Sequence, residues 1–153
     1  MVSNFFLTAQ KNANFQNKIQ SISGSYYEGD WKEGRIEGKG NLYYPSGKLA
    51  YEGEWKNDSF HGKGVFHKEN MENLNDDLDL DPNKISENWV TYIGSFENDL
   101  KHGKGRFIFS NGASFDGEFF EGNVSGQGVL TLTNGDKIVG LWRDNLYVES
   151  QKI

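Results

Sequence analysis

The sequence contains no cysteine, only two prolines and no long apolar segment. Without cysteine, the chain can form neither disulfide bonds nor a thiolate site. No apolar run approaches the roughly 18 residues that a membrane-spanning helix needs. Aliphatic residues are also scarce, because hydrophobic residues make up only 35% of the chain and aromatic residues alone account for 14%. This composition suits a thin, elongated sheet better than a globule with a deep aliphatic centre.

An excess of positive charge is absent as well. The formal net charge is −6 at pH 7, whereas nucleic-acid-binding domains usually carry a basic stripe. We therefore expect no nucleic-acid partner, and the same balance weakens attraction to anionic lipid. The N-terminus lacks the apolar core of a signal peptide, so a cytoplasmic protein is expected.

What the sequence does contain is a repeated pattern, aromatic-x-Gly-x-aromatic. Complete copies begin at Tyr27, Tyr51, Tyr92 and Phe115, and a partial copy begins at Ile138. Each complete copy is followed by a Gly-x-Gly: Gly38-Lys39-Gly40, Gly62-Lys63-Gly64, Gly103-Lys104-Gly105 and Gly126-Gln127-Gly128. The copies start 24, 41, 23 and 23 residues apart. A fixed period of this length is the signature of a stacked repeat array.

The combination of Tyr-x-Gly-x-Trp with a following Gly-x-Gly resembles the MORN repeat. The resemblance covers about residues 24–147, and the departures are phenylalanine for tryptophan at Phe96 and Phe119 and phenylalanine for tyrosine at Phe115. It implies a non-catalytic scaffold. Members of the family commonly sit at cytoskeletal structures, cilia or membrane junctions, and some modules have been proposed to bind phospholipids.

Each repeat is expected to form a β-hairpin, which gives an all-β, elongated, single-layer β-meander with a cap at each end. Successive side chains of a strand point to opposite faces, so Tyr27, Gly29 and Trp31 share one face. We predict that Gly29 lies opposite Gly40 and that Trp31 lies opposite Gly38. Large rings would then cover glycine backbone that otherwise weakens a strand.

The turns and caps follow from the same alignment. In the first repeat, residues 32–37 are interpreted as the connection between the two strands. A left-handed residue is expected at one equivalent position in every copy: Gly34, Asp58, Asp99, Gly122 and Asn145. Phe15–Ser23 is interpreted as an edge strand that caps the first repeat, and Leu146–Val148 as the cap of the last one.

The domain boundaries are also taken from the repeats. Residues 1–23 are interpreted as an N-terminal segment and capping strand, residues 24–147 as the repeat array and residues 148–153 as a tail. The 41-residue step contains an acidic insertion at about residues 69–87, without strand alternation. We interpret this insertion as an exposed loop.

Candidate chemical sites are few. The Asp77–Asp81 segment imitates the start of a calcium loop, but Pro82 stands where the sharp turn needs glycine. His61 and His102 occupy equivalent repeat positions, about 9–10 Å apart at the usual strand spacing, which does not suit shared zinc ligation. A single sheet layer also gives no cleft that excludes water from a reaction. We expect no catalytic residue, no cofactor and no metal.

The candidate partner site is the aromatic face of the sheet. A one-layer sheet leaves part of an aromatic row open, and an exposed apolar strip marks a partner site. We expect the best access in the middle repeats, at Trp55 and Phe96. The expected partner-binding residues are Tyr27, Trp31, Tyr51, Trp55, Tyr92, Phe96, Phe115, Phe119 and Trp142.

The sequence therefore predicts an adaptor whose curved sheet holds a helical or extended segment of another protein, a known mode of recognition. One alternative is a membrane-contact module in which Lys39, Lys63 and Lys104 bind anionic phospholipid, although pairing of these lysines with facing acidic residues is favoured. Another alternative is a regulatory domain that acts on an enzyme in trans. The identity of the partner and self-association stay open.

Overall fold

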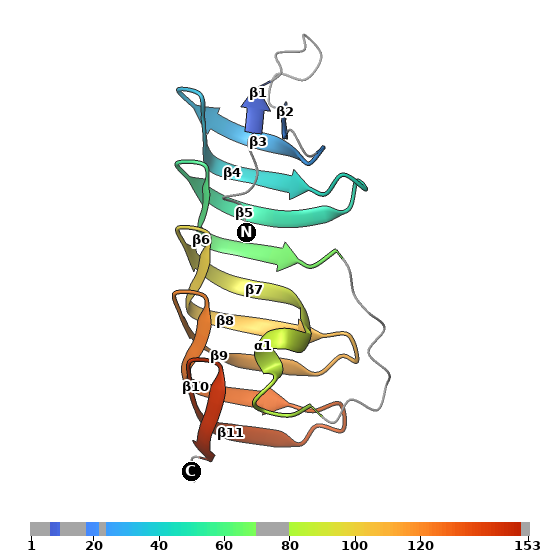
Figure 1. The fold of residues 1–153 in the computed structure, drawn as a ribbon, viewed down its shortest axis with the longest axis vertical. Coiled ribbons are helices and arrows are strands. Elements are labelled where there is room, and N and C mark those ends of the chain that lie inside the picture. Colours follow the sequence, from blue (N-terminus) through green and yellow to red (C-terminus); the bar gives the residue numbers. More distant parts are fainter. Residues whose placement is uncertain (1–6, 10–17, 22–23, 70–79, 151–153) are drawn as a thin grey trace. The chain divides into compact units, whose positions relative to one another are not determined.

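The computed structural model describes residues 7–9, 18–21, 24–69 and 80–150, which form strands and one short helix (Figure 1). The strands are β1 (Leu7–Ala9), β2 (Lys18–Ser21), β3 (Tyr26–Lys32), β4 (Arg35–Tyr43), β5 (Leu49–Lys56), β6 (Ser59–His67), β7 (Trp89–Glu97), β8 (Leu100–Phe109), β9 (Ser114–Phe120), β10 (Asn123–Thr131), β11 (Lys137–Arg143) and β12 (Leu146–Ser150). The helix α1 (Ile85–Asn88) is one turn long and leads directly into β7.

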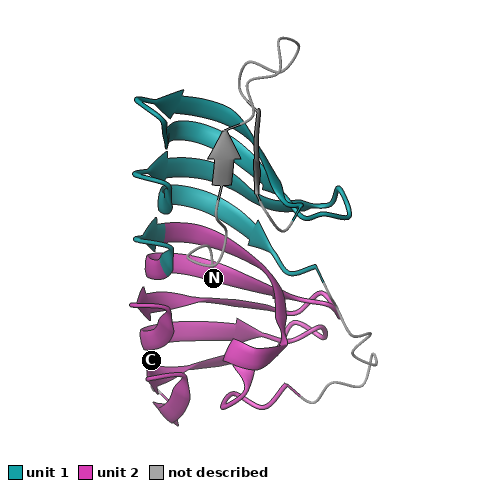
Figure 2. Ribbon diagram, turned by 45° about the horizontal axis from the view of Figure 1, so that its top comes forward, with its two compact units in different colours: residues 1–69, 96–100 teal, residues 70–95, 101–153 magenta. Residues whose placement is uncertain are grey.

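The chain divides into two compact units, shown in Figure 2. Unit 1 comprises residues 1–69 and 96–100, and unit 2 comprises residues 70–95 and 101–153. In unit 1 the strands β1 to β6 pair in chain order, each antiparallel to the next. In unit 2 the strands β8 to β12 pair in the same way. The predicted all-β meander of successive hairpins is confirmed.

Each repeat hairpin closes with a two-residue turn in which both residues have positive φ. In the first hairpin these are Glu33 (φ 52°) and Gly34 (φ 78°), and in the second they are Asn57 (φ 49°) and Asp58 (φ 65°). Positive φ at both central residues is typical of the type I′ turn, whose twist matches that of the flanking strands. The predicted left-handed positions are therefore confirmed, but the connection is shorter than the predicted residues 32–37.

The short turn shifts the register of the hairpin. Gly29 lies opposite Gly40, as predicted, but Trp31 pairs with Ile36 and not with Gly38. The pairing of Trp31 with Gly38 was therefore wrong. Because the turn brings the two strands together early, the additional residues of β4 form a bulge at Gly38, where φ is 94°.

The turns also connect neighbouring hairpins. The Asp58 carboxylate accepts a hydrogen bond from the backbone N–H of Ile36 at 2.7 Å, and the Asp58 N–H donates to the Ile36 carbonyl at 3.1 Å. Within unit 1, Asp99 forms the same two bonds with Phe60, at 2.8 and 3.1 Å. These paired bonds fix the stagger between successive hairpins in addition to the strand pairing.

The ring of each repeat's first aromatic residue lies over glycine backbone. A Cβ atom at Gly40 would collide with the Tyr27 ring, and one at Gly64 would collide with the Tyr51 ring. The prediction that large rings cover bare glycine is confirmed. Phe115 takes the same place over Gly128 in unit 2.

The caps differ in part from the prediction. β12 pairs with β11, with Tyr147 opposite Trp142, so the predicted C-terminal cap is present. β2 is not an edge strand, because it lies between β1 and β3. The remainder of the N-terminal segment (residues 1–6, 10–17 and 22–23), the first part of the insertion (70–79) and residues 151–153 lie outside the described residues.

Candidate segment-binding face

The predicted aromatic row forms the core of the sheet and is not an open strip. Eight of the nine residues are buried: Tyr27, Tyr51, Trp55, Tyr92, Phe96, Phe115, Phe119 and Trp142. Trp31 is half-buried. Trp55 is only 3% exposed and Phe96 only 5% exposed, so the expectation of accessible anchors at these positions was wrong.

Ring-to-ring packing explains this burial. In unit 1 the Trp55 ring stands edge-on to Tyr27 and to Tyr51, with centroids 5.1 Å apart in both pairs. Phe60 stacks on Tyr51 at 3.8 Å and meets Phe96 at 5.5 Å. Edge-to-face contacts of this kind are favourable beyond the area that they bury. Each ring is therefore covered by the rings of the neighbouring repeats.

The tyrosine hydroxyls of the row are also satisfied internally. Tyr27 donates a hydrogen bond to the Asp30 carbonyl at 2.6 Å, and Tyr92 donates to the Ser95 carbonyl at 2.8 Å. Burial raises the pKa of Tyr27 well above its usual range, and the nearby Asp30 charge raises it further. Burial likewise raises the pKa of Tyr92. These hydroxyls therefore stay protonated and hold the turn-side backbone of each hairpin.

Unit 2 carries a second layer on its aromatic face. In Figures 1 and 2 the helix α1 lies over the sheet of unit 2. Leu80 is 5% exposed and Ile85 is fully buried, whereas Asp81, Lys84 and Glu87 are exposed. The second half of the insertion is therefore not an exposed loop, because its apolar side chains are buried.

Hydrogen bonds from β11 and β12 fix this segment to the sheet. The Trp142 indole Nε1–H of β11 donates to the Pro82 carbonyl at 2.9 Å. The backbone N–H of Tyr147 in β12 donates to the Asn83 side-chain oxygen at 3.1 Å. Residues 80–88, which we call the docked segment, thus combine apolar anchors with polar contacts, as a bound peptide would.

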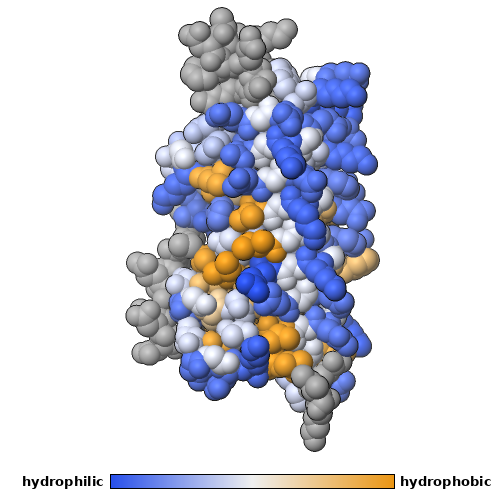
Figure 3. Space-filling view, turned by 180° about the vertical axis from the view of Figure 1, so that it is seen from behind, coloured by the Kyte–Doolittle hydropathy of each residue, from blue (hydrophilic) through white to orange (hydrophobic). Residues whose placement is uncertain are grey.

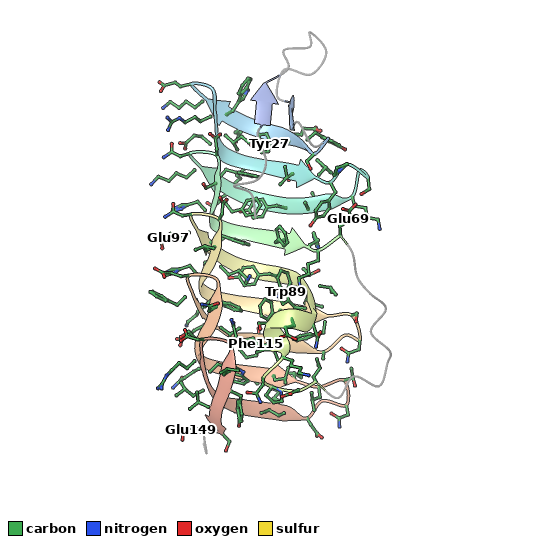
Figure 4. All side chains as sticks on the ribbon, viewed as in Figure 1. Tyr27, Glu69, Trp89, Glu97, Phe115 and Glu149 are labelled. Carbon is green, nitrogen blue, oxygen red and sulfur yellow. The ribbon has the colours of Figure 1, made fainter. Side chains whose placement is uncertain are left out.

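An aromatic stack continues from the docked segment into the sheet. Trp89 follows α1 and stacks on Phe107, with centroids 4.9 Å apart and planes 8° apart; Figure 4 labels its position beside α1. The Lys101 ammonium lies 4.9 Å from the centre of the Trp89 ring. A cation over an indole face is attracted by the ring's quadrupole. The Trp89 indole N–H donates to the Ser86 carbonyl at 3.0 Å, which connects β7 to α1.

The lysine row comprises Lys39, Lys63 and Lys104, and the face of the molecule seen in Figure 3 is mostly hydrophilic with some apolar patches. Lys39, Lys63 and Lys104 are all exposed. Lys39 lies opposite Glu54 on the next strand, and Lys104 lies opposite Glu118. Lys39 and Lys104 are thus placed beside carboxylates, an arrangement that weakens their field at a lipid surface.

The histidines are not gathered into a metal site. His102 Nδ1 accepts a hydrogen bond from the Glu121 N–H at 3.4 Å, and its ring lies 5.3 Å from that of Phe120. Across the described ranges, no group of three or more histidine, aspartate or glutamate residues is placed to hold a metal ion. Of the aspartates in the calcium-like segment, only Asp81 is described, and its carboxylate accepts the Asn83 N–H at 2.9 Å.

Sequence reasoning missed the docked segment. Its signal is weak, because Leu80 and Ile85 are two aliphatic residues in a polar stretch that is too short to show a period. It also missed the role of Trp142 as a hydrogen-bond donor to that segment. The pattern gave Trp142 and Trp55 the same role, since both end an aromatic-x-Gly-x-aromatic motif.

Successive I′ hairpins with aromatic rings over paired glycines define a β-repeat protein. A family model of the MORN repeat matches residues 27–48, 51–70, 92–114 and 115–137, more than half of the chain, so the chain belongs to the MORN repeat family. MORN repeats are generally non-catalytic and are consistent with a module that interacts with proteins or membranes. No curated protein matches the chain. Within the described part of the chain, no helix is both long and apolar enough to cross a bilayer.

Proposed function

We propose that this chain is a non-catalytic interaction scaffold that holds a helical or extended protein segment against the aromatic face of its β-sheet. The observation that carries the proposal is the docked segment of unit 2, in which a turn at residues 81–84 and one helical turn lie on that face. Family membership supports a position at a cytoskeletal or membrane-associated structure.

A protein partner is favoured over a lipid surface. Lys39 faces Glu54 and Lys104 faces Glu118, and the chain carries a net charge of −6. Attraction of a basic segment to anionic lipid is about 1 kcal/mol per unpaired lysine or arginine, and the facing carboxylates offset much of it. The aromatic face, in contrast, offers an indole donor and apolar contacts of the kind that recognise a peptide.

The test is selection from a displayed library of 15-residue peptides against two forms of the chain, the wild type and Ile85→Asp. Ile85 is fully buried in the docked segment, and a buried carboxylate is costly, so the substitution lifts the segment and opens the face. We expect peptides selected on the open form to lose at least fivefold in affinity when Trp142→Phe is added, because the indole donor is lost.

The matched control is Arg106→Gln on the outer face, where Arg106 pairs with Asp116 at 2.6 Å and both side chains are about half exposed. This variant should bind the selected peptides as tightly as its parent. Failure to select any peptide on either form would overturn the proposed function. Salt-sensitive binding to phosphatidylserine vesicles, abolished by replacing the three lysines with alanine, would favour the membrane alternative.

A further inference from the structure

The docked segment has its own internal hydrogen bonds and presents a buried apolar side and an exposed polar side. The Lys84 N–H donates to the Asp81 carbonyl at 2.8 Å, and the Glu87 N–H donates to the Lys84 carbonyl at 3.0 Å. Its polar side chains Asp81, Lys84 and Glu87 are exposed, whereas Leu80 and Ile85 are buried. A peptide with these local bonds would present the same two-sided surface from any chain.

The sheet of unit 2 contains a buried hydrogen-bond donor, the Trp142 indole N–H, whose acceptor belongs to the docked segment. Trp142 is 1% exposed, and its indole N–H donates to the Pro82 carbonyl, which belongs to the segment and not to the sheet. The equivalent Trp55 of unit 1 donates to Gly40 of its own sheet at 3.0 Å. A buried N–H without an acceptor is unfavourable. The face of unit 2 is therefore built around a carbonyl that the sheet itself does not supply to Trp142.

The contacts that hold the segment do not depend on its covalent connection. The two aliphatic anchors are five residues apart, the Pro82 carbonyl lies between them, and the Asn83 side chain reaches the N–H of Tyr147. A segment from another chain could provide the same set of groups. The covalent connection raises the effective concentration of the segment at the face.

From these observations we propose that residues 80–88 are a built-in competitor for the aromatic face of unit 2. The external partner is a protein segment with the same chemistry: two aliphatic anchors five residues apart, a free carbonyl between them, an asparagine or aspartate after that carbonyl and a short helical turn. This inference rests on the proposed function, because it names the class of partner that the face accepts. It also makes binding conditional, since the partner must displace the docked segment.

The test uses a fluorescent peptide that copies residues 80–88, titrated into the full chain and followed by anisotropy. The Ile85→Asp chain should bind this peptide at least tenfold more tightly than the wild-type chain, because its own segment no longer competes. A second peptide with aspartate in place of the isoleucine is the matched control and should bind neither form. Far-UV circular dichroism must show an unchanged sheet spectrum in both chains.

Leu80→Ser, which removes the other anchor, provides an independent way to open the face and should also bind the peptide more tightly than the wild type does. Equal affinity of the peptide for the wild type and for both variants would overturn the inference, as would a folded open variant that does not bind it. If library peptides bind the open face but the copied segment does not, the proposed function is supported, and the proposal that residues 80–88 act as a competitor is contradicted. If no peptide of either kind binds, both fail.

Discussion

The two units use the same motif position in different ways. Trp55 and Trp142 both end an aromatic-x-Gly-x-aromatic strand, and both are almost completely buried. Trp55 donates its indole N–H to Gly40 of the neighbouring hairpin, whereas Trp142 donates to Pro82 of the docked segment. One tryptophan therefore strengthens the repeat array, and the other connects the array to a segment that is not part of the repeat.

This difference bears on where recognition can occur in a repeat protein. Where every ring is covered by the next repeat, as around Trp55, the aromatic row is a core and its burial stabilises the array. Where the indole N–H of a ring donates to a group outside the sheet, as at Trp142, the aromatic row can bind a peptide segment. The repeat motif alone does not distinguish these cases, because both have the same residues at the same spacing.

The largest expected effect tests the core role of Trp55. Trp55→Ala should lower the free energy of unfolding by about 3–5 kcal/mol, because a large buried ring and its edge-to-face contacts are lost. Urea unfolding followed by far-UV circular dichroism measures the change. Glu52→Ala, an exposed change on the same strand, should stay within about 0.5 kcal/mol of the wild type. A loss below 1 kcal/mol in the Trp55 variant would contradict its place in the core.

The second prediction separates the two tryptophans directly. Trp142→Phe removes the donor to Pro82, so the docked segment should open about five- to tenfold more often, which corresponds to a lost hydrogen bond of about 1 kcal/mol. Limited trypsin digestion at Lys84, which is exposed beside the buried Ile85, measures this opening when opening and closing are fast relative to cleavage.

The matched control for this experiment is Trp55→Phe, which removes the indole donor in unit 1. It should lower the free energy of unfolding without increasing native-state cleavage at Lys84, because Trp55 makes its hydrogen bond within its own sheet. Equal acceleration of cleavage in both variants would show that the two tryptophans do not differ as proposed.

Much of the fold could be predicted from the sequence because the repeat encodes local backbone geometry. The glycines and Asx residues of the turns mark left-handed positions, and Gly29 and Gly40 mark the place where rings cross the strands. The register near Trp31 could not be predicted, because only the second residue of its turn, Gly34, is of a type that signals a left-handed conformation. Glu33, with φ 52°, is not a residue type that usually signals this conformation.

The candidate site was harder to predict for a different physical reason. Whether a ring such as Phe96 is open or covered depends on the packing of rings from other repeats, which strand alternation does not determine. The docked segment depends on tertiary contacts of Ile85 with a sheet whose strands are distant in the sequence. The acidic composition of the insertion predicts a solvated loop. Residues 80–88 nevertheless lie on the sheet, with the Leu80 and Ile85 side chains buried.

The third prediction concerns Asp99, which lies in the turn between β7 and β8 and accepts the Phe60 N–H. Asp99→Ala should lower stability by about 1 kcal/mol, because the Phe60 N–H loses its carboxylate acceptor. Asp99→Asn should retain that bond, since Asn145 already accepts the Val124 N–H at 2.7 Å in the equivalent place of unit 2. Thermal unfolding of both variants, with Asn145→Asp as the reciprocal change, measures the difference.

The same position should show a pH dependence of known sign. Burial raises the pKa of Asp99 above its ordinary value near 3.8. A carboxyl whose pKa is raised by folding stabilises the protein below its unfolded pKa, and this contribution is lost as pH rises through the folded value. Relative to the wild type, Asp99→Asn should thus become more stable as pH is raised from 3 to neutrality. An opposite trend would contradict the assignment of burial as the dominant effect.

The smallest expected effect exploits the one complete repeat whose first aromatic residue lacks a hydroxyl. Phe115 lies over Gly128 as Tyr92 lies over Gly105, but only Tyr92 can donate to the backbone three residues later, at 2.8 Å to the Ser95 carbonyl. Phe115→Tyr should place a hydroxyl beside the Glu118 carbonyl and raise stability by about 0.5–1 kcal/mol. Tyr92→Phe, the reverse change, should lower it by a similar amount. Urea unfolding of the two variants and of the double exchange tests this, and a loss of stability in Phe115→Tyr would mean that the pocket in unit 2 is too tightly packed to admit the added oxygen.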